Sequence, residues 1–234
     1  MSTAGRRVGR PRASPRPESG LSAREELLAA ASELFTSRGY AATSTRAVAE
    51  RAGMRQATMY HYFAGKEDLL AALLEGTVTP SLTLARGLLE DDGAGAGERP
   101  APAEARLWYL CRSDVELLCG GPHNLGGLYL LPEIRTERFA DFGRVRGELK
   151  CAYGKLLAAT ASCGSLGTGE LRLRTDLVFG LIESVILVHR SAPDRSVQVF
   201  ASATADAALR VAGVPEEDLA AVREAAGTLS RPAG

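Results

Sequence analysis

The stretch that decides the fold is Ser44-Thr-Arg-Ala-Val-Ala-Glu-Arg-Ala-Gly-Met-Arg-Gln-Ala-Thr-Met-Tyr-His-Tyr-Phe63. It predicts two short helices that are separated at Gly53. The apolar side chains expected to be buried are Val48 and Ala52 in the first helix, and Met54, Met59 and Phe63 in the second. Two short helices set at a steep angle by a glycine turn form a helix-turn-helix, whose second helix enters the major groove of DNA. The stretch therefore predicts double-stranded DNA as a partner.

The charge of the chain is unevenly distributed. The 234 residues carry no net charge, with 45% apolar and 24% charged residues, which are ordinary globular values. Residues 1–66 hold eleven Arg and Lys against five Glu, a net charge of +6, so the remainder carries −6. A basic front end on an acidic body fits a nucleic-acid contact confined to the N-terminus, although uneven charge can also arise by chance.

The four cysteines are scattered, without a C-x-x-C pair or a nearby His at zinc spacing. We expect Cys111, Cys119, Cys151 and Cys163 to be buried free thiols of a reducing cytosol, and we expect no metal site. The arginine-rich N-terminus lacks the apolar segment of a signal peptide. The most apolar run, 177–188, is shorter than the ~20 residues of a membrane-spanning helix. The sequence predicts a soluble cytoplasmic protein.

Helical periodicity without sustained alternation predicts an all-α fold. Ser22-Ala-Arg-Glu25 has the pattern of a capping box, and it opens a helix that Gly39 ends. The further helices expected are 66–90, 103–119, a short one near 124–131, 138–162, 169–191, 194–212 and a terminal one within 216–229. Residues 1–20 are rich in Arg, Pro, Ser and Gly, which predicts a flexible arm.

Residues 24 to 70 resemble the TetR family of bacterial transcriptional repressors. The matching elements are in register across four helices: Phe35, Gly39, Thr45, Ala52-Gly53, Thr58-Met59-Tyr60, Tyr62-Phe63, Lys66-Glu67 and Leu69. The resemblance implies a homodimer with a DNA-binding domain and a C-terminal helical domain that binds a small molecule. We expect the arm over 1–20, a three-helix DNA-binding domain over 21–68, the ligand-binding and dimerisation domain over 69–215, and a tail over 216–234.

The side chains expected to read DNA lie in and around the second helix of the motif, about 55–61. Gln56 can pair bidentately with adenine, and Arg46 and Arg55 with guanine. The resemblance adds base contacts by Arg46 and Gln56, a phosphate or thymine contact by Tyr60, and phosphate anchors around them. The DNA-binding residues expected within the motif are Thr45, Arg46, Arg55, Gln56, Ala57, Thr58, Tyr60, His61, Tyr62 and Lys66.

Two features are particular to this chain. Family members often carry Ser or Thr where Arg55 stands; Arg cannot cap the recognition helix in that way and is free to contact DNA instead. Arg6-Arg-Val-Gly-Arg-Pro-Arg12 resembles the Gly-Arg-Pro core of an AT-hook, so Arg10 and Arg12 are expected in a minor groove. The alternative for this arm is a solvated tail.

The ligand side is less explicit in the sequence. The candidates for the pocket are Trp108, Arg112, Tyr129, Phe142, Phe179 and Glu183, each of which can instead be an ordinary core or surface residue. Glu183 interrupts an apolar helix, so its charge needs a partner: an inducer, a protein Arg or a group across a dimer interface. The helices 169–191 and 195–212 are expected to build the dimer interface, with an intramolecular core helix as the alternative.

The function that these features predict is a ligand-responsive repressor that binds a palindromic operator and is released by an inducer. The alternative is an effector-independent DNA-binding regulator or an activator. No Gly-rich phosphate loop, metal-spaced cluster or nucleophile elbow is present, and the chain has only three His. We therefore expect neither an enzyme nor a cofactor.

Overall fold

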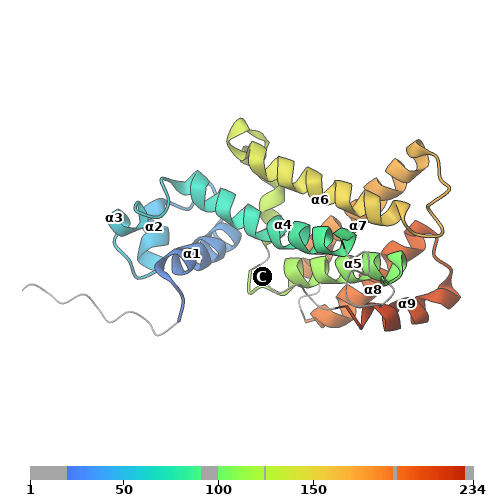
Figure 1. The fold of residues 1–234 in the computed structure, drawn as a ribbon. Coiled ribbons are helices and arrows are strands. Elements are labelled where there is room, and N and C mark those ends of the chain that lie inside the picture. The colour runs from blue at the N-terminus through green and yellow to red at the C-terminus, as the bar shows by residue number, and fades with distance from the viewer. Residues whose placement is uncertain (1–19, 91–99, 124, 192–193, 230–234) are drawn as a thin grey trace, which may run out of the picture.

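The computed structural model describes residues 20–90, 100–123, 125–191 and 194–229, and within these ranges it contains helices and no strands. The predicted all-α fold is confirmed. Figure 1 shows a small helical domain at one end of the molecule, and a long helix that runs from it into a larger helical body. The arm, with Arg10 and Arg12, lies outside the described residues.

The small domain is formed by α1 (Ala23–Ser37), α2 (Thr45–Arg51) and α3 (Gln56–Met59), followed by the long helix α4 (Lys66–Glu90). The predicted capping box is present: the Ser22 side chain accepts from the Glu25 backbone N–H, and the Glu25 carboxylate accepts from the Ser22 N–H. α3 is shorter than the expected 55–61, because only residues 56–59 are helical.

Two glycines make the turns of the small domain possible. Gly39, after α1, has φ of 91°, and Gly53, between α2 and α3, has φ of 67°. Side chains other than Gly rarely adopt this left-handed region, so the predicted stop at Gly39 and the break at Gly53 are confirmed.

The core of the small domain holds most of the residues that the pattern predicts. Val48, Met59 and Phe63 are buried together with Leu27 and Phe35 of α1 and residues of α4. Ala52 and Met54 also pack against this core but are only half-buried, so their predicted burial is confirmed in part. They flank Gly53, where the chain turns at the surface and no further layer covers them.

The larger body contains five more α-helices and short 3₁₀ turns within the described ranges. They are α5 (Ala103–Cys119), η1 (Leu125–Leu130), η2 (Pro132–Arg135), η3 (Glu137–Phe139), α6 (Ala140–Ala158), α7 (Thr168–Ser191), α8 (Val197–Ala212), η4 (Glu216–Asp218) and α9 (Leu219–Ala226). α5 lies at the centre and packs against α4, α6, α7, α8 and α9. None of the described helices is long and apolar enough to cross a membrane.

A hydrogen-bonded cluster joins α5 to α8 and α9. The Trp108 indole Nε1 donates to Asp206 Oδ1 at 2.9 Å, and the Arg223 guanidinium holds both oxygens of the same carboxylate. Burial alone would raise the pKa of Asp206, but the hydrogen bonds from Arg223 and Trp108 outweigh it and lower that pKa. The terminal helix is therefore fastened to the body by a polar contact as well as by packing.

Residues 125–142 connect the two parts of the molecule, and we call them the bridging segment. Leu128, Phe139 and Phe142 are buried in the core cluster of the small domain, not in the main core of the body. Arg138 forms an ion pair with Asp68 at the start of α4. A displacement of the bridging segment would therefore also move residues in the core of the small domain.

The cysteines are free thiols, as predicted, but they are not all buried. Cys111, Cys119 and Cys163 are buried, whereas Cys151 is exposed on α6. The expectation of burial is wrong for Cys151 because it lies on the solvent side of an amphipathic helix whose inner side is formed by Ala152, Tyr153 and Leu156.

Candidate DNA-binding surface and effector cavity

Three polar side chains meet where α2 and α3 begin. The Gln56 amide Nε2 donates to Thr45 Oγ1 at 3.1 Å and lies 3.3 Å from the Tyr60 hydroxyl. The Thr45 and Tyr60 hydroxyls are 3.3 Å apart. These contacts align donors and acceptors from both motif helices on one exposed surface, which suits a groove of DNA.

The start of α3 lacks a side-chain cap. Arg55 occupies the N-cap position and its side chain makes no capping hydrogen bond, as the sequence predicts. At α2, by contrast, Ser44 Oγ accepts from the Ala47 backbone N–H at 3.2 Å. The guanidinium of Arg55 is therefore free for an external contact, and the first N–H groups of α3 remain open to an anion.

The other predicted motif residues divide by exposure. Ala57, Tyr60, His61 and Tyr62 are exposed, and Thr58 is half-buried. Arg46 is exposed and its Nε donates to Glu50 at 2.8 Å, one turn along α2. Because both partners of this pair face water, exchanging Glu50 for a phosphate or a base is not costly.

Lys66 has a second set of partners that sequence reasoning missed. Its Nζ donates to the Tyr40 carbonyl at 2.9 Å and lies 4.2 Å above the centre of the Tyr40 ring. Burial, with the nearby carboxylates of Glu67 and Glu133, raises the pKa of Tyr40 to about 12. Lys66 thus steadies the turn before α2, and no local pattern signals a contact across 26 residues.

The body contains a cavity of about 500 Å³ between η1, η2, α6 and α7. Among the predicted ligand residues, Tyr129, Phe142 and Glu183 line it. Phe179 borders a smaller neighbouring chamber of about 20 Å³, which Tyr129 and Glu183 also line. Tyr129 stands between the two, with its hydroxyl 2.5 Å from Thr77 Oγ1 on α4. Burial raises the pKa of Tyr129 well above its usual range, so it stays a neutral hydrogen-bonding group.

The partner of Glu183 is a protein Arg, one of the three alternatives that the sequence left open. Arg146 Nε donates to Glu183 Oε1 at 2.5 Å, and Nη2 donates to Oε2. The same guanidinium lies 5.2 Å from the centre of the Phe179 ring. The hydrogen bond to Glu183 raises the pKa of Arg146 despite its partial burial.

Two predicted ligand residues lie away from this cavity. Trp108 is buried and bonded to Asp206, and Arg112 pairs with Glu116 at 2.8 Å on the same helix. Their side chains do not line the cavity, because α5 turns them toward α8 and along its own surface instead. Periodicity alone does not distinguish these two faces of a buried helix.

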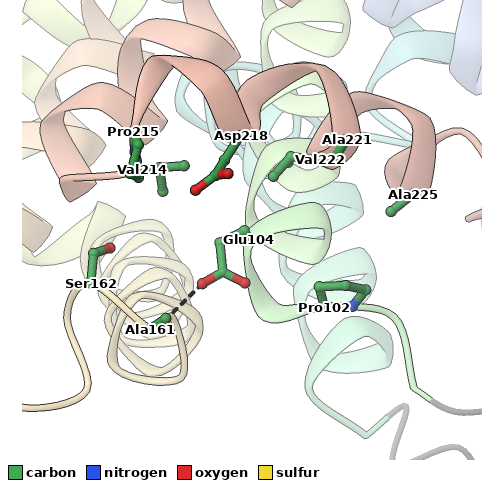
Figure 2. Close-up of a pocket in the computed structure, with 10 residues that line it drawn as sticks. All are labelled: Pro102, Glu104, Ala161, Ser162, Val214, Pro215, Asp218, Ala221, Val222 and Ala225. Atoms are coloured by element: carbon green, nitrogen blue, oxygen red, sulfur yellow. Dashed lines mark hydrogen bonds between the residues drawn. The ribbon is translucent and has the colours of Figure 1, made fainter.

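A separate cavity of about 270 Å³ lies between the start of α5, the turn after α6, and the α8–α9 connection (Figure 2). Its walls are largely apolar, with Pro102, Val214 and Val222, and the Glu104 carboxylate accepts from the Ala161 N–H at 2.7 Å. Nothing in the sequence signals this cavity. In the part of the chain that the structure describes, no His, Cys, Asp and Glu cluster could hold a metal.

The fold and the motif surface define a helix-turn-helix DNA-binding protein with a large helical body. The family model described as "Bacterial regulatory proteins, tetR family" matches residues 27–73. The crystal structure of Mycobacterium smegmatis AmtR is 44% identical to this chain, covers 93% of it and 100% of its own chain, and superposes with a TM-score of 0.74. The chain therefore belongs to the TetR family and is a DNA-binding transcriptional regulator.

More distant relatives agree with this family. The repressor KstR2 of Mycobacterium tuberculosis (strain ATCC 25618 / H37Rv) is 44% identical over 55 residues, which are 24% of this chain and 28% of KstR2. This chain thus matches well under a third of the length of that curated relative. FadR of Bacillus subtilis, in complex with stearoyl-CoA, covers 82% of this chain and 99% of its own at 21% identity and a TM-score of 0.59, which shows a common fold. Both relatives are named as transcriptional regulators.

Proposed function

We propose that the protein is a ligand-responsive repressor that binds a palindromic operator as a homodimer and leaves it when a small molecule enters the body. The proposed domains are those expected from the sequence. Residues 21–68 read DNA, residues 69–215 bind the ligand and the partner subunit, and residues 1–20 and 216–234 flank these two domains. Because the proposed partner is chromosomal DNA, we place the protein in the cytoplasm. The single observation that carries the proposal is that the bridging segment forms both the wall of the 500 Å³ cavity and part of the small domain's core.

The bridging segment supports coupling between ligand and DNA through named contacts. Tyr129 and Phe142 line the cavity, and both pack on the core of the small domain. Arg138 pairs with Asp68, whose Oδ2 accepts from the Ala64 N–H at 2.9 Å in the turn that follows the recognition helix. A ligand that displaces the aromatic wall would therefore shift the turn that positions α3.

An exposed apolar stripe supports the homodimer. Leu173, Leu177 and Val188 of α7 are between 43% and 53% exposed, and Val199 of α8 is exposed as well. Several exposed apolar side chains on two neighbouring helices are typical of an interface. Two copies joined through α7 and α8 would present two recognition helices related by twofold symmetry, which suits a palindrome.

The dimer is tested by analytical ultracentrifugation at micromolar concentration. We expect a dimer for the wild type and a monomer for Leu177→Lys. Leu130→Lys is the control, because Leu130 is also exposed (66%, against 53% for Leu177) but lies outside the stripe. A monomeric wild type would overturn the dimer.

Operator binding is tested by selection on random duplex DNA, which we expect to yield a palindrome. A metabolite and antibiotic panel is then screened by thermal shift, and each stabilising compound is tested for release of the selected DNA. FadR, described in complex with stearoyl-CoA, supports a small-molecule effector for this fold. A body that no compound stabilises, on a protein that still binds its palindrome, would contradict ligand control.

A regulator that activates, or that needs no effector, is the second candidate. One relative, 42% identical over 52 residues, is the transcriptional activator FasR of Mycolicibacterium smegmatis. The Arg146–Glu183 pair also satisfies two of the charges at the cavity wall without a ligand. Expression of a reporter gene placed behind the selected operator distinguishes repression from activation.

A further inference from the structure

We propose that the 500 Å³ cavity selects an amphipathic monoanion, a molecule with an apolar body and one carboxylate or equivalent anionic head. This inference rests on the proposed function, since it names the chemical class of the effector at that site. It is argued from the charge, the apolar surface and the volume of the cavity.

The charge of the lining favours an anion. Among the described residues, Arg135, Arg146 and Glu183 are the charged ones that border the cavity, and their net charge is +1. Arg146 holds both oxygens of Glu183, so these two charges neutralise each other. Arg135 forms no ion pair with any described residue and is exposed at the end of η2. A guanidinium that borders a cavity without a carboxylate of its own is suited to bind one.

The rest of the lining fits an apolar body. Leu130, Ile134, Phe142 and Leu187 border the cavity, and Leu130 and Leu187 are among the most exposed large apolar residues of the described chain. A volume of about 500 Å³ lies within the range of small-molecule sites, which is roughly 300–1,000 Å³. A ligand with an aliphatic or aromatic body would cover these side chains while its head meets Arg135.

A cationic ligand is disfavoured by the same geometry. It would face the unpaired Arg135, and the one carboxylate in the lining is already taken by Arg146. Only a ligand that supplies negative charge gains a new ion pair here.

The test compares three probes that share an apolar chain and differ in the charge of the head: octanoate, octylamine and octanol. Thermal shift and calorimetry on the full-length protein should give the order octanoate, then octanol, then octylamine in affinity. Arg135→Gln should weaken octanoate binding several-fold and no more, because water screens an ion pair made by an exposed guanidinium. It should leave octanol unchanged, and Arg135→Lys should retain part of the preference.

Arg172→Gln is the matched control. Arg172 is also an exposed Arg, on α7, and it does not border the cavity. The proposal is overturned if octanoate gives no shift, if octylamine binds as tightly as octanoate, or if Arg135→Gln and Arg172→Gln bind octanoate equally well. It is also overturned if octanoate dissociates the dimer without stabilising the subunit, because the cavity would then receive the partner subunit.

The outcomes for the ligand class and for the repressor are separable. Octanoate binding that leaves the affinity for the selected operator unchanged keeps the ligand class and contradicts ligand control. Release of the operator by a cationic or neutral compound that competes for this cavity keeps the ligand-responsive repressor and contradicts the anionic class.

Discussion

The turn at Gly53 offers the sharpest test of how this motif is built. Gly53 has φ of 67°, and a Cβ placed there would meet no atom within 4 Å. The cost of Gly53→Ala is therefore conformational and not steric. The left-handed conformation costs an L-residue roughly 1–2 kcal/mol, partly offset because Ala lowers the entropy of the unfolded chain. We expect a net loss of about 1 kcal/mol, which corresponds to about 2–4 °C in Tm for a chain of this size.

The assay is thermal and urea unfolding followed by circular dichroism, with operator affinity measured in parallel. Gly53→Asn should lose much less, since Asn tolerates the left-handed region. Gly147→Ala is the control, for which we expect a gain in stability in place of a loss. Gly147 is exposed inside α6, and its Cβ would also meet open space. Ala should therefore raise the free energy of unfolding by about 0.5–1 kcal/mol. Equal stability of Gly53→Ala and wild type, or an equal loss in Gly53→Asn, would refute the reasoning.

Three further predictions follow from the contacts described. Tyr60→Phe should lower operator affinity several-fold, since one hydrogen bond to DNA contributes about 0.5–1.5 kcal/mol. Tm should change little, because the contacts of the Tyr60 hydroxyl with Thr45 and Gln56 lie at the exposed surface; a fall in Tm with intact affinity would contradict the assignment of Tyr60 to DNA contact. Arg138→Gln removes the ion pair with Asp68, and it should weaken the hydrogen bond from the Ala64 N–H to Asp68 in the turn after α3. We expect faster amide hydrogen exchange at Ala64 with little change in global stability. Unchanged exchange would count against a role of the Arg138–Asp68 pair in this turn. The lowered pKa of Asp206 means that its contribution to stability is complete above the ordinary value of 3.8 and is lost as pH falls through the folded pKa. Fluorescence of the single Trp, which bonds to Asp206, should therefore report unfolding of this contact near and below that pH. Asp206→Asn should make the free energy of unfolding less dependent on pH in this acidic range. An identical pH dependence in the variant and the wild type would exclude this cause.

The residues around the motif show how far local patterns reach. The capping box at Ser22, the turns at Gly39 and Gly53 and the missing cap at Arg55 were all predictable, because each depends on a few neighbouring residues. Burial at the edges of the motif was less predictable: Ala52 is only half-buried, because a helical pattern states which face is apolar and not whether another element covers it.

The sequence by itself determined the all-α fold, the position of the motif and the family, because these depend on helical periodicity, caps and turns within short stretches. Only the tertiary structure decided which side chains meet across the chain. The partner of Glu183 is Arg146, 37 residues away, and that of Trp108 is Asp206, 98 residues away. The bridging segment likewise belongs to the core of the small domain, although it lies far along the chain. Such contacts depend on how helices cross and rotate against one another, which their individual patterns do not specify.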